Sequence, residues 1–434
     1  MLFVRVSPPS WGGAGGGVDR GARTLSLFLF LLAVALTPGI SQKAISPDEI
    51  LAGARQDAGV QAQAGHLEFA RQVNPRLPFV DRVSLRTQTD RLELQRQRYA
   101  ARISTNGIRE IRAERRYQQA NLAVVESRQR ILWHEALAIR YETMLSHRLA
   151  EQDMELQHQL VLVFEDKITV LKTRAEAGAE PDVEDLIEAE YNRDEAALRL
   201  TAAELFLQET CHTLVLLTPG ADSGLVLITA GFLPPEKLLS AATSLPGQAP
   251  VHPEFLEKTA RVARIEAQYE AEKARSVQLL DFVQIRHDNR PTEPLSRDIS
   301  FAVGINLPFR GTSSYKMAEL KIEKNAAEVE AMQEKSEAER RTQDARAQLV
   351  SLDAQYRQAK QHVDENLATY TLREAGSGLV SDPMTLLRAK ELLLKRKQRL
   401  LNIETAMYAQ YLNLLDWSGA MSAEPLVNYL SDAR

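Results

Sequence analysis

The stretch REAGSGLVSDPMTLLRAKE, residues 373–391, decides the fold when it is compared with RAEAGAEPDVEDLIEAE, residues 174–190. Each stretch ends one helical segment, turns at a glycine and begins a second helical segment. At one constant offset the two stretches and their continuations share Gly178 and Gly378, Asp182 and Asp382, Leu186 and Leu386, Ala189 and Ala389, and Leu200 and Leu400. Two helical hairpins of one design, one in each half of the chain, indicate an internal duplication.

A long helix leads into each turn. Residues 108–175 contain no proline, and Leu156, Leu160 and Val163 recur at spacings of four and three. A continuous helix of about 65 residues is roughly 100 Å long, because an α-helix rises about 1.5 Å per residue. Such a helix does not fit inside one globular domain, so we expect it to pack along its length as in a coiled coil.

Each half of the chain repeats one order of elements, which is short helix, β-hairpin, long helix, turn and medium helix. The first repeat is expected to open with one helix over residues 46–73. The predicted divisions are 1–41, an N-terminal extension and signal peptide; 42–218, the first repeat, with a hairpin at about 79–104; 219–251, a linker or equatorial segment; 252–420, the second repeat, with a hairpin at about 279–309; and 421–434, a C-terminal tail. The fold class is therefore mainly α with a small β part, built as a duplicated long-helix coiled coil.

The N-terminus has the pattern of a secretory signal peptide. Arg20 and Arg23 precede the apolar run LSLFLFLLAVAL, residues 25–36, and small residues follow at Gly39 and Ser41. This run is too short to span a membrane as a helix. No other segment has about 18 or more uninterrupted apolar residues, which disfavours a helical membrane protein.

Residues 299–307 show the clearest strand pattern in the chain, because apolar residues alternate with small or polar ones. This alternation is typical of a sheet that covers a core in water, and also of a barrel strand with lipid outside and water inside. The attached helices, too long for one chain to cover, favour the second interpretation. The residues that we expect to face lipid are Ile299, Phe301, Val303, Ile305 and Leu307.

Four strands per chain are predicted, whereas bacterial membrane barrels begin at about eight and an open sheet edge is not tolerated in lipid. Three chains together would supply about twelve strands, enough for a closed and water-filled β-barrel. The first hairpin also carries the arginines Arg82, Arg86, Arg91, Arg96, Arg98 and Arg102. Those at alternating positions are expected to line the lumen, but Arg91 fits lipid poorly, so this hairpin is either short or part of a reduced barrel.

Several classes of function find no support. The formal net charge of −5 and the absence of a basic stripe disfavour a nucleic-acid partner. The single cysteine, Cys211, has no internal disulfide partner, and its apolar neighbours predict a buried structural thiol. The eight histidines show no metal-ligand spacing and are expected at helix surfaces or interfaces, so no metal or other cofactor is predicted. Paired glutamates such as Glu188 and Glu190 fit solvated helix faces, so no catalytic residue is predicted and the chain is not expected to be an enzyme.

The duplicated plan, the helix openings at Asn74-Pro75 and His252-Pro253-Glu254, the strand ending INLPF at 305–309 and the two glycine turns resemble the TolC-type outer-membrane efflux proteins, or outer membrane factors. The resemblance implies a homotrimer with a shared β-barrel in the bacterial outer membrane and a helical α-barrel in the periplasm. It implies passive conduction in a tripartite efflux or type I secretion system. The implied partners are a periplasmic adaptor (membrane fusion) protein, an inner-membrane RND or ABC pump and outer-membrane lipid.

The resemblance also implies two sets of functional residues near the turns. The adaptor is expected to dock on Arg174, Gly178, Asp182, Asp185, Leu186, Arg373, Gly376, Gly378, Asp382 and Leu386. An acidic residue early in the last helix narrows the periplasmic mouth in this family. Asp185 matches that position in the first turn and Thr385 in the second, so the candidate mouth residues are Asp382, Thr385 and Arg388.

One alternative remains from the sequence. The arginine-rich first hairpin is also compatible with a secreted periplasmic coiled-coil protein, structural or for interaction, whose hairpins pair in water and form no pore.

Overall fold

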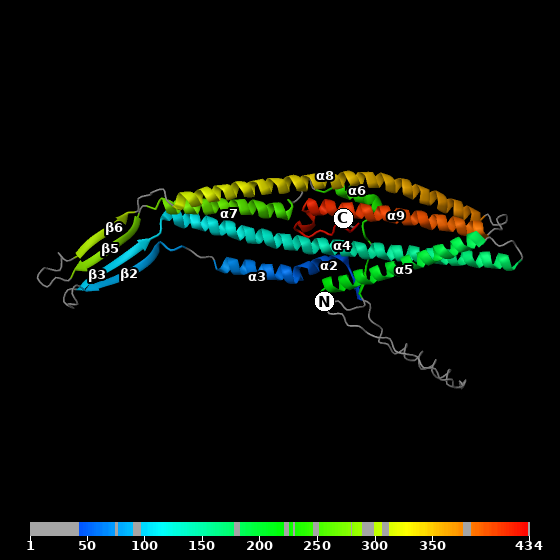
Figure 1. Cartoon of the computed structure of the whole chain (residues 1–434), viewed down its shortest axis with the longest axis horizontal. Coiled ribbons are helices and arrows are strands. Elements are labelled where there is room, and N and C mark those ends of the chain that lie inside the picture. Colours follow the sequence, from blue (N-terminus) through cyan, green and yellow to red (C-terminus); the bar gives the residue numbers. More distant parts are fainter. Residues whose placement is uncertain are drawn as a thin grey trace, which may run out of the picture.

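The protein is a long helical rod with a small sheet at one end (Figure 1). The computed structural model describes residues 43–73, 77–89, 97–177, 183–220, 225–228, 231–245, 251–278, 280–288, 299–305, 312–375 and 383–432. The sheet lies at one end of the rod, and the helices that flank the two glycine turns lie at the other. Among the described residues, no helix has the length and apolar character needed to cross a bilayer.

Two helices run most of the length of the rod. Helix α4 spans Ile108–Glu176 and α8 spans Thr312–Ala375, with 69 and 64 residues. At about 1.5 Å per residue each is roughly 100 Å long. The shorter helices that pack beside them are α3 (Ala58–Gln72), α5 (Val183–Leu217), α7 (Pro253–Ser276) and α9 (Pro383–Trp417). Helix α4 contacts α3 and α5, α8 contacts α7 and α9, and contacts from α4 to α7 and α9 join the two halves.

The apolar stripes of the long helices form the seams between them. On α4, Leu160 and Val163 are buried in a cluster with Leu394 of α9. On α8, Leu349 and Tyr356 are buried as well. Each such side chain removed from water contributes about 1.5–3 kcal/mol, so the stripes are the main source of helix packing.

The helix predicted over residues 46–73 is wrong as a single element. The structure has α2 (Pro47–Gly53), the 3-10 turn η1 (Ala54–Gln56) and then α3. Gly53 lies against the carbonyl oxygen of Leu217, where an added Cβ would be 3.3 Å away. The fully buried Arg140 of α4 holds the break, because it donates to the Ile50 carbonyl at 2.9 Å and to the Asp57 carboxylate at 2.6 Å.

The start of the first repeat and the segments between and after the repeats carry structure that the sequence pattern did not reveal. Strand β1 (Lys43–Ile45) pairs in parallel with β4 (Leu225–Leu227), and α6 (Pro235–Thr243) packs against α9. The C-terminal segment begins with η3 (Ala420–Ser422) and buries Tyr429 and Leu430. These elements, with the middle of α4 and the end of α9, form the largest apolar core, at mid-rod. They are too short for periodicity to predict.

The sheet contains four antiparallel strands in the order β2-β3-β5-β6. The strands are β2 (Val80–Thr89), β3 (Gln97–Thr105), β5 (Leu280–Asp288) and β6 (Ile299–Ile305). Pairing of β3 with β5 joins the first hairpin to the second, so both halves contribute to one sheet. Within the described part of the chain, β2 and β6 form the two outer edges, each with one side unpaired.

Candidate functional site

One face of the sheet is apolar across all four strands. Directly paired residues of an antiparallel sheet project to the same face. The pairing therefore places Val83, Ile103, Val283 and Val303 in one row and Leu85, Ala101, Ile285 and Phe301 in the next. Leu85 is 82% exposed and Phe301 is 73% exposed, and Ile299, Val303 and Ile305 are exposed too. Of the five residues expected to face lipid, four lie on this face, and Leu307 is outside the described residues.

The opposite face of the sheet is polar. Its rows contain Ser84, Arg102, Gln284 and Ala302, and then Arg86, Ala100, Arg286 and Ser300. This face borders a hollow of about 640 Å³ that Arg82, Arg86 and Arg102 help to line. Four of the arginines in the first hairpin lie in the described strands, and the three that line the hollow avoid the apolar face. Arg91 and Arg96 lie outside the described residues.

A glycine allows close packing on the polar face. The Phe282 ring lies so near Gly304 that an added Cβ at this glycine would be 2.2 Å from the ring. The Arg102 guanidinium lies 3.5 Å from the centroid of the same ring and pairs with Asp281 at 3.2 Å. Phe282 therefore covers the backbone of β6 and holds an arginine above the hollow.

At the far end of the rod, two residues from the separate turn predictions meet. Arg388 Nη2 of α9 donates to Asp185 Oδ2 of α5 at 2.8 Å. The Arg388 side chain is 60% exposed and that of Asp185 is 33% exposed, so this is a surface ion pair. It links the helix after the first turn to the helix after the second.

The other predicted turn residues divide into three groups. Arg174 and Thr385 are exposed, and Leu186 and Leu386 are half-buried. Arg373 lies in α8, but its side chain is not among those described. Outside the described residues lie Gly178, Asp182, Gly376, Gly378 and Asp382.

A second, more buried ion pair lies about one helical turn further along α9 from the glycine turn. Lys167 of α4 contacts Glu391 of α9, both side chains being less than 15% exposed, and Lys395 pairs with Glu391 at 2.6 Å. Burial alone would raise the pKa of Glu391, but the hydrogen bonds from Lys167 and Lys395 outweigh it and lower that pKa. Sequence reasoning missed Glu391 as a site residue, although a lysine within the apolar stripe of α4 was a signal for a buried partner. The two ion pairs fix α9 against α4 and α5, the two helices that flank the first glycine turn.

Most of the described histidines divide between exposed helix faces and buried contacts between helices. His134, His147 and His252 are buried, and Cys211 is only half-buried. His134, His252 and Asp416 each offer one ligand atom within 4.8 Å of the others. This cluster was not evident from the sequence because its members lie on three separate helical segments, with none of the short spacings that mark a metal site.

Known proteins resemble this chain in structure. No family model matches the sequence, and no curated protein matches it. The outer membrane protein VceC from the bacterial pathogen Vibrio cholerae has a TM-score of 0.59 at 15% identity, covering 86% of this chain and 96% of that one. The open state of the Neisseria gonorrhoeae MtrE outer membrane channel has a TM-score of 0.61 at 16% identity, covering 86% and 88%. The Campylobacter jejuni CmeC outer membrane channel has a TM-score of 0.59 at 12% identity, covering 89% and 86%.

Identities this low establish the fold. The chain has the fold of the TolC-type outer-membrane channels, so the resemblance is confirmed at the level of the fold. The fold class, mainly α with a small β part, is confirmed with it.

Proposed function

We propose that the chain is one subunit of a homotrimeric outer-membrane channel that conducts solutes passively from the periplasm to the exterior. The single observation that carries the proposal is the two-faced sheet. Its apolar face is exposed in the single chain, with Leu85 and Phe301 more than two-thirds accessible, while arginines line the hollow on the other face. An apolar patch of this kind costs free energy in water, whereas lipid would cover it at no such cost.

The two open edges support assembly. Among the described residues, the outer sides of β2 and β6 present unpaired backbone groups. Each such group costs several kcal/mol in hydrocarbon, where water is absent. Four strands are too few to close a barrel. Pairing of β6 from one copy with β2 of the next would satisfy both edges, and three copies would make a barrel of about twelve strands with a wet lumen. The apolar rows would then face lipid and the arginines would face water.

The helical rod would continue the wall of the channel on the periplasmic side. Helix pairs from three copies would form an α-barrel, and an adaptor protein could lay its own helices in the grooves beside the turns. The support for this partner, and for an inner-membrane RND or ABC pump beyond it, is the resemblance to TolC-type proteins. The pathway would be tripartite efflux or type I secretion, with no catalytic step in this chain.

The mouth of such a channel would be held by contacts between helices. At the end of the rod that carries the glycine turns, the Asp185–Arg388 pair joins α9 to α5 and the Lys167–Glu391 pair joins α9 to α4. Small shifts of α9 would require the exposed pair to break first, so this pair is the candidate latch. The pair includes Asp185, which matches the acidic position of the family in the first turn, whereas Thr385 occupies that position in the second.

Fractionation and conductance test the proposal together. We expect trimers that dissociate on heating, found in the outer-membrane fraction, and discrete conductance steps when the purified protein is added to planar bilayers. Release of the protein by osmotic shock, with no conductance, would instead support the periplasmic coiled-coil alternative. The exposed apolar face disfavours that alternative, because a protein that stays in water gains nothing from it.

A further inference from the structure

Two buried histidines and an aspartate meet at the middle of the rod. His134 lies in α4, His252 is the residue before α7, and Asp416 lies at the end of α9. His134 is 5% exposed and His252 is 7% exposed. Their ring centroids are 5.6 Å apart, and the rings are nearly perpendicular at 80°. Three segments that are distant in sequence therefore present nitrogen and oxygen ligands to one point.

The hydrogen bonds of His134 define which nitrogen faces the cluster. Its Nδ1 lies 3.1 Å from Ser422 Oγ, and its Nε2 lies 2.6 Å from Asp416 Oδ1. The Ser422 hydroxyl donates to the Gly419 carbonyl at 3.4 Å, so its oxygen is available to accept the Nδ1 proton. The neutral tautomer with its proton on Nε2 donates that proton to Asp416, whereas the tautomer with its proton on Nδ1 turns the Nε2 lone pair toward a carboxylate oxygen, which is repulsive. A cation held by both groups removes the repulsion.

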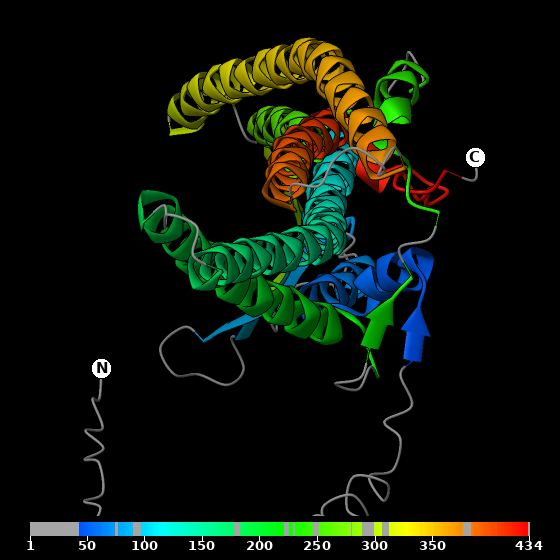
Figure 2. The same cartoon turned by 90° about the vertical axis from the view of Figure 1, so that its right-hand side faces the viewer.

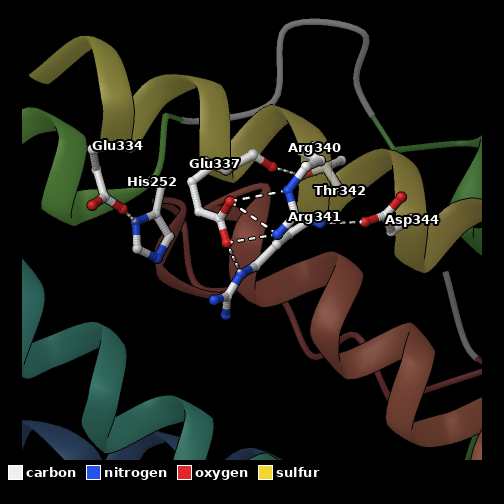
Figure 3. A network of polar contacts seen from close by, with 8 residues as sticks. His252, Glu334, Glu337, Arg340, Arg341, Thr342 and Asp344 are labelled. Carbon is white, nitrogen blue, oxygen red and sulfur yellow. Dashed lines mark hydrogen bonds and ion pairs between the residues drawn. The ribbon is translucent and has the colours of Figure 1, made fainter.

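Packing fixes the His252 ring, although one of its nitrogens has no hydrogen-bond partner in the described part of the chain. Its ring stacks on Trp417, with centroids 4.9 Å apart and 19° between the planes. Its Nδ1 is buried and has no hydrogen-bond partner among the described residues. The nearest carboxylate oxygen, Glu334 Oε1 on α8, is 3.8 Å away, and Figure 3 shows this side chain directed at the ring.

Acidic groups gather around the two histidines. Glu254 lies at the start of α7 and forms a second cluster of possible ligands with His252 and Glu334. Lys258, the cation that acts on Glu334, lies 3.5 Å from Glu330 and is shared with it. The surroundings therefore favour an added positive charge.

We propose that His134, His252 and Asp416 form a site for a divalent transition-metal ion, and that Zn²⁺ fits the donor set. Two imidazole nitrogens and one carboxylate oxygen are typical zinc ligands, and water would take the fourth position. Bonds of about 2.0–2.2 Å in a tetrahedron separate ligand atoms by about 3.4 Å. That separation lies between the 2.6 Å contact of His134 with Asp416 and the 4.8 Å limit of the cluster. Glu334 would accept the Nδ1 proton of His252, as carboxylates commonly do behind a ligating histidine.

The consequence of the site is mechanical and does not depend on the proposed channel function. The metal would tie α4 of the first half to the start of α7 and the end of α9 in the second half. It would lie beside the largest apolar core, next to the polar network of Glu337, Arg340 and Arg341 on α8 (Figure 3). There Arg341 lies 4.2 Å from the centroid of the Trp417 ring that supports His252.

The test is a metal titration of the purified full-length protein in detergent, after treatment with a chelator. Co²⁺ is the probe, because tetrahedral cobalt absorbs visible light, and Zn²⁺ should displace it. We expect one ion per chain, with loss of the signal in His134→Gln, His252→Gln and Asp416→Asn. Glu334→Gln keeps all three ligands and should weaken binding by about 10–100-fold.

The matched control is His66→Gln, which removes an exposed histidine of α3 far from the cluster in sequence and should leave binding unchanged. Circular dichroism of each variant shows whether it is folded. The proposal is overturned if folded wild-type protein binds no cobalt or zinc, or if the ligand substitutions leave binding as it was. In that case His134 and Asp416 make only a direct hydrogen bond between Nε2 and Oδ1.

Discussion

Arg388 and Asp185 join the two helices that follow the two glycine turns, with 2.8 Å between Arg388 Nη2 and Asp185 Oδ2. The two residues belong to different repeats, and the view along the rod shows α5 and α9 as separate helices at this end (Figure 2). The contact is therefore a link between the two repeats.

Breaking this link should open the channel at little cost in stability. We expect Arg388→Ala to raise conductance in planar bilayers, while the free energy of unfolding falls by less than about 1 kcal/mol because the pair is exposed. The charge-swapped double variant Asp185→Arg with Arg388→Asp should restore the wild-type conductance. Arg399→Ala, at an exposed arginine of the same helix, is the control. If Arg388→Ala and the wild type had equal conductance, the ion pair would have no role in closing the channel.

The buried pair should make stability depend on pH. Because the folded-state pKa of Glu391 is lowered, its stabilising effect is complete above the ordinary glutamate pKa of about 4.5 and is lost as the pH falls through the folded value. Glu391→Gln should cost about 1.5–3 kcal/mol at pH 7, since it removes charged hydrogen bonds from Lys167 and Lys395. Denaturant unfolding at pH 7 and at acidic pH measures both effects.

The control for that experiment is Glu190→Gln, which removes a more exposed ion pair with Lys172. This variant should lose less stability and keep the acid sensitivity of the wild type. If Glu391→Gln were as sensitive to acid as the wild type, another carboxylate would be responsible.

A charged side chain on the apolar face of the sheet should impair insertion into the outer membrane. Phe301→Arg places a cation on the proposed lipid face, where it costs about 2–4 kcal/mol at mid-membrane. We expect less protein in the outer-membrane fraction and fewer heat-sensitive trimers. Ser300→Arg, one residue away on the polar face, should insert normally. Equal insertion of the two variants would contradict the proposed orientation of the sheet.

Glycine should be required at position 304 because the Phe282 ring packs directly against it. An added methyl group would lie 2.2 Å from that ring, so Gly304→Ala must displace it and weaken the pairing of β5 with β6. We expect lower trimer stability to heat on gel electrophoresis. The double variant Gly304→Ala with Phe282→Ala should recover part of the loss, because the collision is gone. No recovery would mean that the glycine acts through the backbone alone.

The sequence by itself determined the elements whose signal is local. Helix periodicity predicted α4 and α8 and alternation predicted β6, because each of these patterns lies within a few dozen consecutive residues. The duplication was predicted from two glycine turns 200 positions apart, each of which is itself a short local motif. The alternation of arginines also indicated that most of them would share one face of the first hairpin.

Only the tertiary structure decided which distant residues meet. Arg388 pairs with Asp185, and Arg140 binds Asp57 where the first predicted helix is interrupted. His134 contacts Asp416, which is 282 positions away in the sequence. The relative register of packed helices sets such contacts, and that register depends on the packing of whole seams rather than on any local pattern.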